Sequence, residues 1–303
     1  MNSPSDQKIS WPHFFGLVGG AVGIAFAPIF AVLGARIGNL GLIEVAFWRL
    51  FFGTLAIGLV FFFSDRTGDK SGETRWGAWM WFPGLIFAGD FAAWHWSFEH
   101  TSVANSTLLA NVAIVFITIF SWLVWKEKIS RAFLVGALVA AGGVVLLVAS
   151  SAVRETPPVD GDPVFGDFLA LVTACFYGTY LLLIKYFRRW HSAPRLLFWA
   201  SAVAAALMLP VALIHQGPIF PDTLAGWWPL VALGVISHAG GQGLIAYGLK
   251  GVPASLGAMT LLVQPVCTAG LGVWILGQDL IPMQVLGGGV VLLGLALAIR
   301  SKV

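Results

Sequence analysis

Long apolar stretches separated by short polar turns fill almost the whole chain. Ten of them approach the ~20 residues that an α-helix needs to cross the hydrocarbon core of a bilayer. We therefore predict an all-α membrane protein with ten transmembrane helices. The predicted spans are 12–35, 42–63, 77–98, 103–125, 132–151, 166–186, 195–215, 227–247, 254–276 and 282–299.

The pattern repeats after about half the chain. Residues 102–143 match residues 253–294 with a shift of 151, which brings Gly136 onto Gly287 and Gly143 onto Gly294. Five spans in each half would make the second half enter the bilayer from the opposite side, an inverted repeat typical of alternating-access carriers. We predict a first repeat at 1–151, an outward-facing linker at 152–165 and a second repeat at 166–303.

Composition and charge agree with this class. Of 303 residues, 58% are hydrophobic and 10% are charged, whereas a soluble domain carries about 25% charged residues. Threading the spans through a bilayer places 14 of the 17 Lys and Arg on the side of the N-terminus and two on the other side. The positive-inside rule then predicts both termini in the cytoplasm. We assign the chain to a bacterial inner (plasma) membrane. Because the positive-inside distribution accounts for the net charge of +3, we predict no nucleic-acid partner.

Two opposite charges lie well inside the predicted membrane region. Arg49 and Asp90 fall at similar depths in the second and third spans, counted at ~1.5 Å per residue. Charged groups are costly in lipid and normally have partners, so we predict that these two approach one another. Two interpretations stay open: an ion pair that locks adjacent helices, or Asp90 as a proton or substrate-ammonium site tuned by Arg49.

Polar side chains also recur at helical spacing in five spans. Hydrogen bonds between helices explain any single stripe, but convergence at one depth favours a polar cavity. Trp94 is either an aromatic lid for this cavity or part of an interfacial belt. His238 is either a buried neutral histidine or a titrating switch. The predicted substrate-binding residues are Asp90, Trp94, Asn111, Tyr177, His238, Gln242 and Gln264.

Two prolines interrupt apolar spans. Pro28 lies toward one end of the first span, and Pro265 lies mid-membrane, where it frees the carbonyl of Leu261. We predict them as hinges, with a plain kink as the alternative. The two cysteines, Cys175 and Cys267, are interpreted as buried apolar residues. No spacing of His, Cys or carboxylates indicates a metal site, and no cofactor motif is present.

The run 92–130, AAWHWSFEHTSVANSTLLANVAIVFITIFSWLVWKEKIS, resembles the EamA-type signature of the drug/metabolite transporter superfamily. In that pattern a small-residue turn precedes an apolar span and a Gly-Glu-Arg-like cytoplasmic turn, here Lys126, Glu127 and Lys128. The second copy departs from the pattern by placing Gln278 where a Glu is usual. The resemblance implies a basket of ten helices around a central cavity. Glu127 and Gln278 would lie at the membrane edge as caps or gate elements.

We therefore predict a secondary transporter rather than an enzyme, exporting small metabolites such as amino acids or their analogues by alternating access. No nucleotide-binding motif is present, so an ion gradient, with the proton as candidate, or downhill flow would drive transport. The alternatives are an uptake permease, a channel or scaffold, and an intramembrane lipid-modifying enzyme, for which no nucleophile–base pair is visible. The expected partners are the solute and the lipid bilayer, with a homodimer as candidate assembly.

Overall fold

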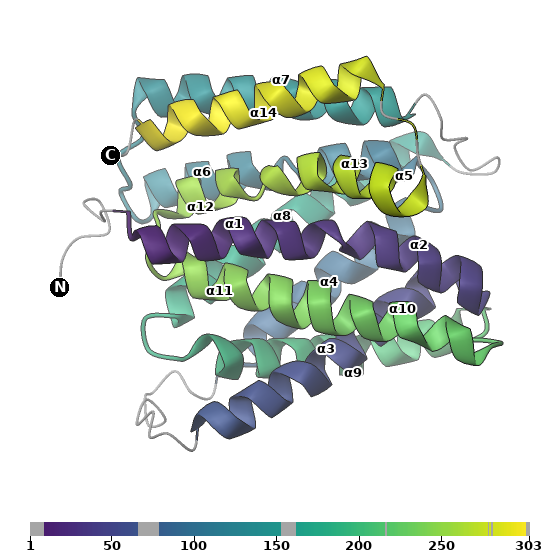
Figure 1. The fold of residues 1–303 in the computed structure, drawn as a ribbon. Coiled ribbons are helices and arrows are strands. Elements are labelled where there is room, and N and C mark those ends of the chain that lie inside the picture. The colour runs from purple at the N-terminus through teal and green to yellow at the C-terminus, as the bar shows by residue number, and fades with distance from the viewer. Residues whose placement is uncertain are drawn as a thin grey trace.

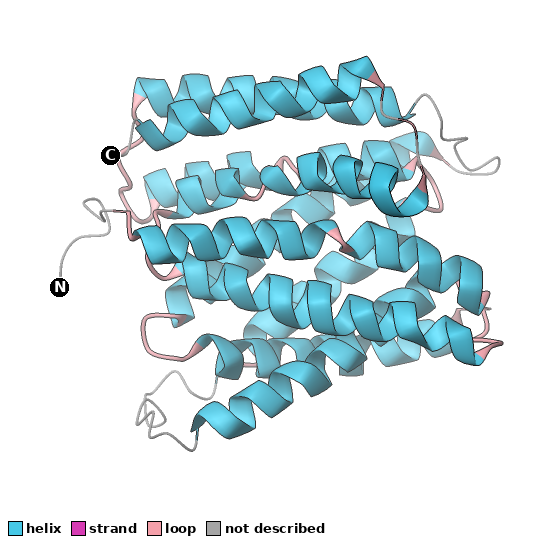
Figure 2. Cartoon of the chain, viewed as in Figure 1, coloured by secondary structure: helices cyan, strands magenta, loops and turns pink. Residues whose placement is uncertain are grey.

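The computed structural model of the chain describes residues 9–65, 79–152, 162–215, 217–277, 279 and 281–300. Within these residues the chain is built of helices and contains no strand (Figure 1, Figure 2). Helices suit lipid because every backbone donor and acceptor bonds within its own segment. They are α1 (Trp11–Ala25), α2 (Ala27–Gly38), α3 (Leu42–Asp65), α4 (Phe82–Ser97), α5 (Val103–Ala110), α6 (Ala113–Leu123), α7 (Arg131–Ala152), α8 (Pro163–Phe187), α9 (Ala193–Ile214), η4 (Leu224–Gly226), α10 (Trp227–Ala232), η5 (Leu233–Gln242), α11 (Gly243–Leu249), α12 (Ala254–Thr260), α13 (Val263–Leu276) and α14 (Pro282–Arg300).

Nine helical segments of the described residues are long and apolar enough to cross a membrane. They coincide with nine of the predicted spans, so the chain is an integral membrane protein. The predicted span 77–98 is shorter in the structure, because α4 covers 16 residues, or about 24 Å at 1.5 Å per residue. Residues 77 and 78 lie outside the described part of the chain. The count of ten transmembrane helices therefore stays a prediction.

Several helix ends are set by local sequence. The Ser102 hydroxyl accepts a bond from the Asn105 backbone N–H at the start of α5 (3.1 Å). The Asp162 carboxylate accepts from the N–H groups of the first turn of α8 at 3.0 and 3.2 Å. Both are N-caps that satisfy otherwise free donors. At the other ends, Asn39 (φ 54°) closes α2 and Gly277 (φ 65°) closes α13 in the left-handed conformation.

Four predicted spans are not single regular helices. The first is interrupted at Phe26 between α1 and α2, the fourth between α5 and α6, and the ninth between α12 and α13. The eighth contains a π-helix, η5, between α10 and α11. Proline alone does not cause these breaks, because the α5–α6 break at residues 111–112 contains none.

Both prolines predicted as hinges lie in the first turn of the helix that follows a break, Pro28 in α2 and Pro265 in α13. The carbonyl of Leu261 does not stay free as predicted, because it accepts from the Gln264 N–H at 3.0 Å. At the other break, the Thr268 hydroxyl of α13 donates to the Ala25 carbonyl of α1 at 3.1 Å. Neighbouring groups therefore satisfy backbone atoms that each break releases.

Helices α7 and α14 pack against each other through glycines, in a layer of their own in Figure 1. A Cβ added to Gly136 would lie 2.6 Å from the Gly294 carbonyl oxygen, and one on Gly294 would lie 2.5 Å from the Gly136 oxygen. The corresponding distances between Gly143 and Gly287 are 2.7 and 2.8 Å. Gly136 matches Gly287 in the sequence repeat and Gly143 matches Gly294, so matching residues exchange partners across the interface.

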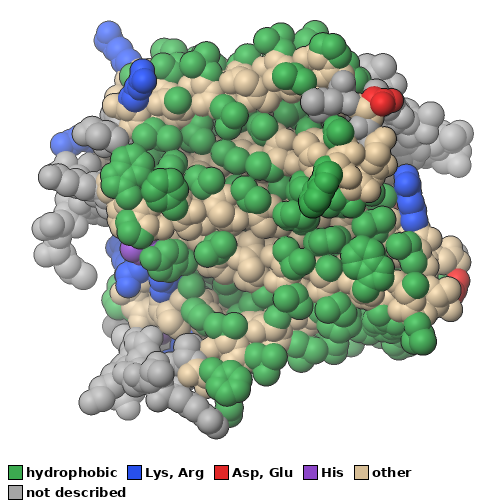
Figure 3. Space-filling view, in the orientation of Figure 1, with side chains coloured by type: hydrophobic (Ala, Val, Ile, Leu, Met, Phe, Trp, Pro, Cys, Tyr) green, Lys and Arg blue, Asp and Glu red, His purple; other side chains and the backbone are tan. Residues whose placement is uncertain are grey.

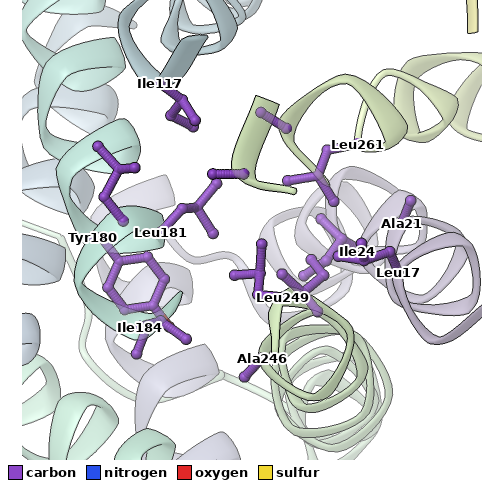
Figure 4. Close-up of a cluster of buried hydrophobic side chains, with 14 of the residues drawn as sticks. Leu17, Ala21, Ile24, Ile117, Tyr180, Leu181, Ile184, Ala246, Leu249 and Leu261 are labelled. Carbon is purple, nitrogen blue, oxygen red and sulfur yellow. The ribbon is translucent and has the colours of Figure 1, made fainter. Parts of the chain in front are cut away.

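The larger of the two buried hydrophobic clusters in the described part of the chain extends over most of the helices. Figure 4 shows a part of it, in which Leu249 of α11 lies between Tyr180 and Ile184 of α8 and Leu17 and Ile24 of α1. Close packing of this kind holds helices together in lipid, where hydrophobic burial supplies little driving force.

The outer surface carries the apolar side chains expected of a lipid-facing protein. Figure 3 shows hydrophobic groups over the middle of the visible face, with most of the coloured Lys and Arg at the end where α14 finishes. The coloured Asp and Glu lie at the opposite end, together with one basic side chain. Among the described residues, α1 also begins at the basic end (Figure 1).

Candidate functional site

The Arg49 side chain of α3 is the centre of a buried polar cluster. Its guanidinium carbon lies 5.1 Å from the centroid of the Phe91 ring on α4, a cation–π contact. Only 9% of the residue is exposed, and its Nε atom has no hydrogen-bond partner. Arg49 acts electrostatically on Asp90, His95, Tyr177, Tyr180 and His238.

Asp90 of α4 is the acidic member of the cluster and is 8% exposed. Its carboxylate interacts electrostatically with Arg49 and with Tyr177. No direct ion pair within 4.0 Å joins Asp90 to Arg49 among the described residues. The two opposite charges therefore lie in one buried environment without a direct bridge between α3 and α4.

Aromatic rings form one wall of the cluster. Phe87 of α4 stacks on Tyr180 of α8 with centroids 4.2 Å apart and planes inclined by 8°. The same Phe87 ring stacks on His238 of η5 at 5.8 Å, and Tyr177 lies 6.3 Å from Tyr180. The Gln242 side chain of η5 lies close enough to the Tyr177 hydroxyl to influence it electrostatically. Three helices, α4, α8 and η5, thus converge on the cluster.

His238 is fully buried and is held from two sides. Its Nε2 atom lies 2.8 Å from the Ser201 hydroxyl of α9, while Nδ1 has no partner. On α3, Gly53 faces the imidazole ring so closely that an added Cβ would clash with it. The Ser201 contact engages Nε2 and leaves Nδ1 without a hydrogen-bond partner.

The other predicted site residues make contacts of their own. Trp94 packs on His95 (5.3 Å between centroids) and Phe98 (4.8 Å), and its buried Nε1 has no partner. Asn111 lies at the α5–α6 break, where its amide donates to its own helix at Thr107 (2.8 Å). Gln264 is half-buried in the first turn of α13. The structure therefore brings Asp90, Tyr177, His238 and Gln242 together around Arg49.

The sequence did not predict Ser201 as a partner of His238. It is a single hydroxyl in an apolar span, and no spacing links it to a residue 37 positions away. His95 was visible only as an ionisable residue within a span. In the structure its Nδ1 atom donates to the Phe91 carbonyl at 2.7 Å, and its ring stacks on Phe91.

Glu127, interpreted from the sequence as a cap or gate element, joins the two halves of the chain. It is 4% exposed, and its carboxylate accepts from the backbone N–H of Ser255 (3.4 Å) and from the Ser255 hydroxyl at the start of α12. A carboxylate is favourable at a helix N-terminus. Nearby, Lys185 of α8 donates to the carbonyls of Leu249 (2.9 Å) and Val252. Gln278 lies outside the described residues.

The described residues contain no group of three or more His, Cys, Asp or Glu that could hold a metal ion. The cysteines are free, and the prediction that both are buried is wrong for Cys175, which is exposed on α8. The chemistry of the central cluster is therefore that of a buried cation, carboxylate, phenols, imidazole and amide. Such groups bind a polar solute by charge and hydrogen bonding.

Membrane-length helices around a buried polar cluster define the chain as an integral membrane protein. Comparison with known families specifies it further. The pattern of the EamA-like transporter family matches this chain twice, over residues 11–149 and over residues 164–300. The chain belongs to the EamA-like transporter family, as its resemblance to the EamA-type signature predicted.

Individual relatives agree with this assignment. An uncharacterized transporter of Archaeoglobus fulgidus is 27% identical over 259 residues, covering 86% of this chain and 87% of that protein. The pseudopaline exporter CntI of Pseudomonas aeruginosa is 24% identical over 260 residues, or 86% of each chain. A solved crystal structure aligns with a TM-score of 0.79 at 17% identity, covering 94% of this chain and 96% of that one. That likeness shows the same fold.

Proposed function

We propose that this transporter exports a small zwitterionic metabolite, such as an amino acid or an analogue, by alternating access. One observation carries the proposal: Arg49 and Asp90 are buried in the same cluster without a direct ion pair. Buried charges need partners. A solute that brings its own carboxylate and ammonium groups supplies a partner for each, and Tyr177 and Gln242 add hydrogen-bonding groups.

The aromatic wall suits a solute with an apolar or ring-bearing side chain. Phe87 stacks on both Tyr180 and His238, and the three rings give the site a rigid aromatic border. Trp94, Asn111 and Gln264 complete the proposed solute path. Asn111 and Gln264 lie at helix breaks, and irregular backbone at membrane depth is typical of carrier binding sites.

We also propose that the two halves, 1–151 and 166–303, are inverted five-helix repeats that rock around this site. Support comes from the exchange of glycine partners between α7 and α14 and from the double match to the family. Exchange of matching residues across an interface is what a two-fold axis produces. The linker 152–165 would join the halves; its residues 153–161 lie outside the described part of the chain.

Export across the bacterial inner membrane, with both termini cytoplasmic, is the proposed setting. The bias of Lys and Arg toward one end supports the orientation, and the relative named as an exporter supports the direction. A proton is the proposed coupling ion, with Asp90 as its carrier. A homodimer remains the candidate assembly. Reporter tags at Met1 and Val303 test the orientation, which fails if the tags report opposite faces.

Counterflow in proteoliposomes tests the function. A thermal-shift screen of amino acids and related metabolites first selects a stabilising solute. Purified protein is then reconstituted, loaded with that unlabelled solute and given a labelled trace outside. A carrier accumulates the label transiently, whereas a channel, scaffold or enzyme does not. Loss of counterflow in Arg49→Gln with retention in Cys175→Ser, an exposed control, supports the central site; equal counterflow in both refutes it.

A further inference from the structure

A crevice of about 540 Å³ opens between α3, α4 and α9, and its wall residue His95 also interacts electrostatically with Arg49. Its walls are largely apolar and include Ile43 of α3, Trp96 of α4, and Met208, Val211 and Ile214 of α9. This volume is typical of small-molecule sites, which range over about 300–1,000 Å³. The apolar walls call for a ligand with an apolar body.

One edge of the crevice carries a compact charged group. His215 lies between two carboxylates: its Nδ1 is 2.8 Å from Glu44 Oε1, and its Nε2 is 3.5 Å from Glu99 Oε1. Two carboxylates therefore surround a single imidazole, so acidic groups outnumber basic ones at this edge. His95 is the other titratable side chain on the wall, and its Nδ1 is engaged with the Phe91 carbonyl.

The two carboxylates differ in accessibility. Glu44 is fully buried, and its Oε2 atom has no hydrogen-bond partner. Glu99 lines the crevice, and 49% of its side chain is exposed. Neither Lys nor Arg is among the described residues that line the crevice. The uncompensated charge therefore faces a space with apolar walls, and a cation attached to an apolar body would complement it.

We propose that this crevice binds an organic cation of the alkylamine class. Its ammonium group donates to the Glu99 carboxylate beside His215, and its chain lies along Met208, Val211 and Ile214. Charge-assisted hydrogen bonds are about twice as strong as neutral ones, so the head group selects amines over alcohols of equal length. The site does not depend on which solute the Arg49 cluster carries.

Photoaffinity labelling in lipid nanodiscs tests the site. The probe is a long-chain primary amine with a diazirine in its chain, and an alcohol with the same chain serves as the matched probe. Mass spectrometry maps labelled peptides. We expect the amine to label residues 208–214 about tenfold more than the alcohol, with protection by unlabelled octylamine but not by octanol. Equal labelling by the two probes overturns the proposal.

Two variants separate this site from general partition into lipid. Glu99→Gln removes a partly exposed charge and is expected to weaken labelling by the amine about tenfold, leaving the alcohol unchanged. Val211→Trp fills the crevice and is expected to abolish saturable labelling. Leu213→Trp, on an exposed neighbour that does not line the crevice, serves as its control. Unchanged amine labelling in Glu99→Gln and Val211→Trp also overturns the proposal. Because this is a binding assay, its result is independent of counterflow.

Discussion

The packing of α7 on α14 leads to a quantitative prediction about Gly143. The perturbation is Gly143→Ala, which adds one methyl group at the interface. That Cβ would lie 2.6 Å from the Val291 backbone nitrogen and 2.7 Å from the Gly287 carbonyl oxygen. Ordinary contacts to a Cβ begin at 3.4 Å. Since both neighbours are backbone atoms, no side-chain rotation relieves the clash, and the helices have to move apart.

The required movement is about 0.8 Å, and a gap of that size forfeits a quarter to a half of each dispersion contact that it opens. Overpacking of this kind costs about 1–3 kcal/mol, offset in part by the ~1 kcal/mol that Ala gains over Gly in a helix. Gly142→Ala keeps that gain without the clash, because no atom lies within 4 Å of its added Cβ. We expect Gly143→Ala to be less stable than Gly142→Ala by roughly 2 kcal/mol.

Thermal denaturation of the detergent-purified protein, followed by size-exclusion chromatography, measures this difference. A change of 2 kcal/mol corresponds to roughly 3 °C in Tm for a chain of 303 residues, at about 2.1 cal/mol/K of unfolding entropy per residue. The second helix offers an independent pair: Gly287→Ala meets the Gly143 carbonyl oxygen at 2.8 Å, whereas Gly289→Ala meets nothing within 4 Å. Equal Tm values within both pairs would refute the close approach of the two helices.

Three further predictions concern the interior. Asp90→Asn should remove the dependence of transport on a proton gradient, since the amide cannot carry a proton; unchanged pH dependence at normal expression would limit Asp90 to a structural role. Ser201→Ala leaves both nitrogens of buried His238 without a protein partner, and should lower the free energy of unfolding by about 1–3 kcal/mol; an unchanged Tm would contradict the importance of that contact. Pro265→Ala should leave the α12–α13 break in place, because the matching break at Asn111 has no proline. Spin labels on α12 and α13 measure the distance across the break. A distance as long as that of one straight helix would contradict this prediction.

The outline of the fold could be predicted because the bilayer imposes it. Lipid requires apolar segments of fixed length, so nine spans could be located from hydrophobicity alone. Depth counting also placed Arg49 and Asp90 at one level, and the structure finds them in one electrostatic environment. Boundaries were less exact: α8 begins at Pro163, directly after its cap Asp162, three residues before the predicted span 166–186.

Pro28 and Pro265 indicated two of the helix breaks, but the other breaks and the pairings between distant residues could not be predicted. The break at Asn111 contains neither Pro nor Gly, so the sequence gives no local signal for it. The contact of His215 with Glu44 joins residues 171 positions apart, and it depends on how α9 packs on α3. Without an alignment of relatives, nothing in a single sequence connects such residues.

The wide turns of η5 have a consequence for the way its side chains can move. A π-helix bonds each residue to one five positions away, one more than in an α-helix. In an α-helix each residue advances the chain by about 100° of rotation. If one turn between Leu233 and Gln242 tightened, every side chain beyond it would therefore swing by roughly that angle. Gln242 would turn away from Tyr177, and α11 beyond it would rotate about its own axis, so that side chains on this half of the segment exchange neighbours without a break in the helix.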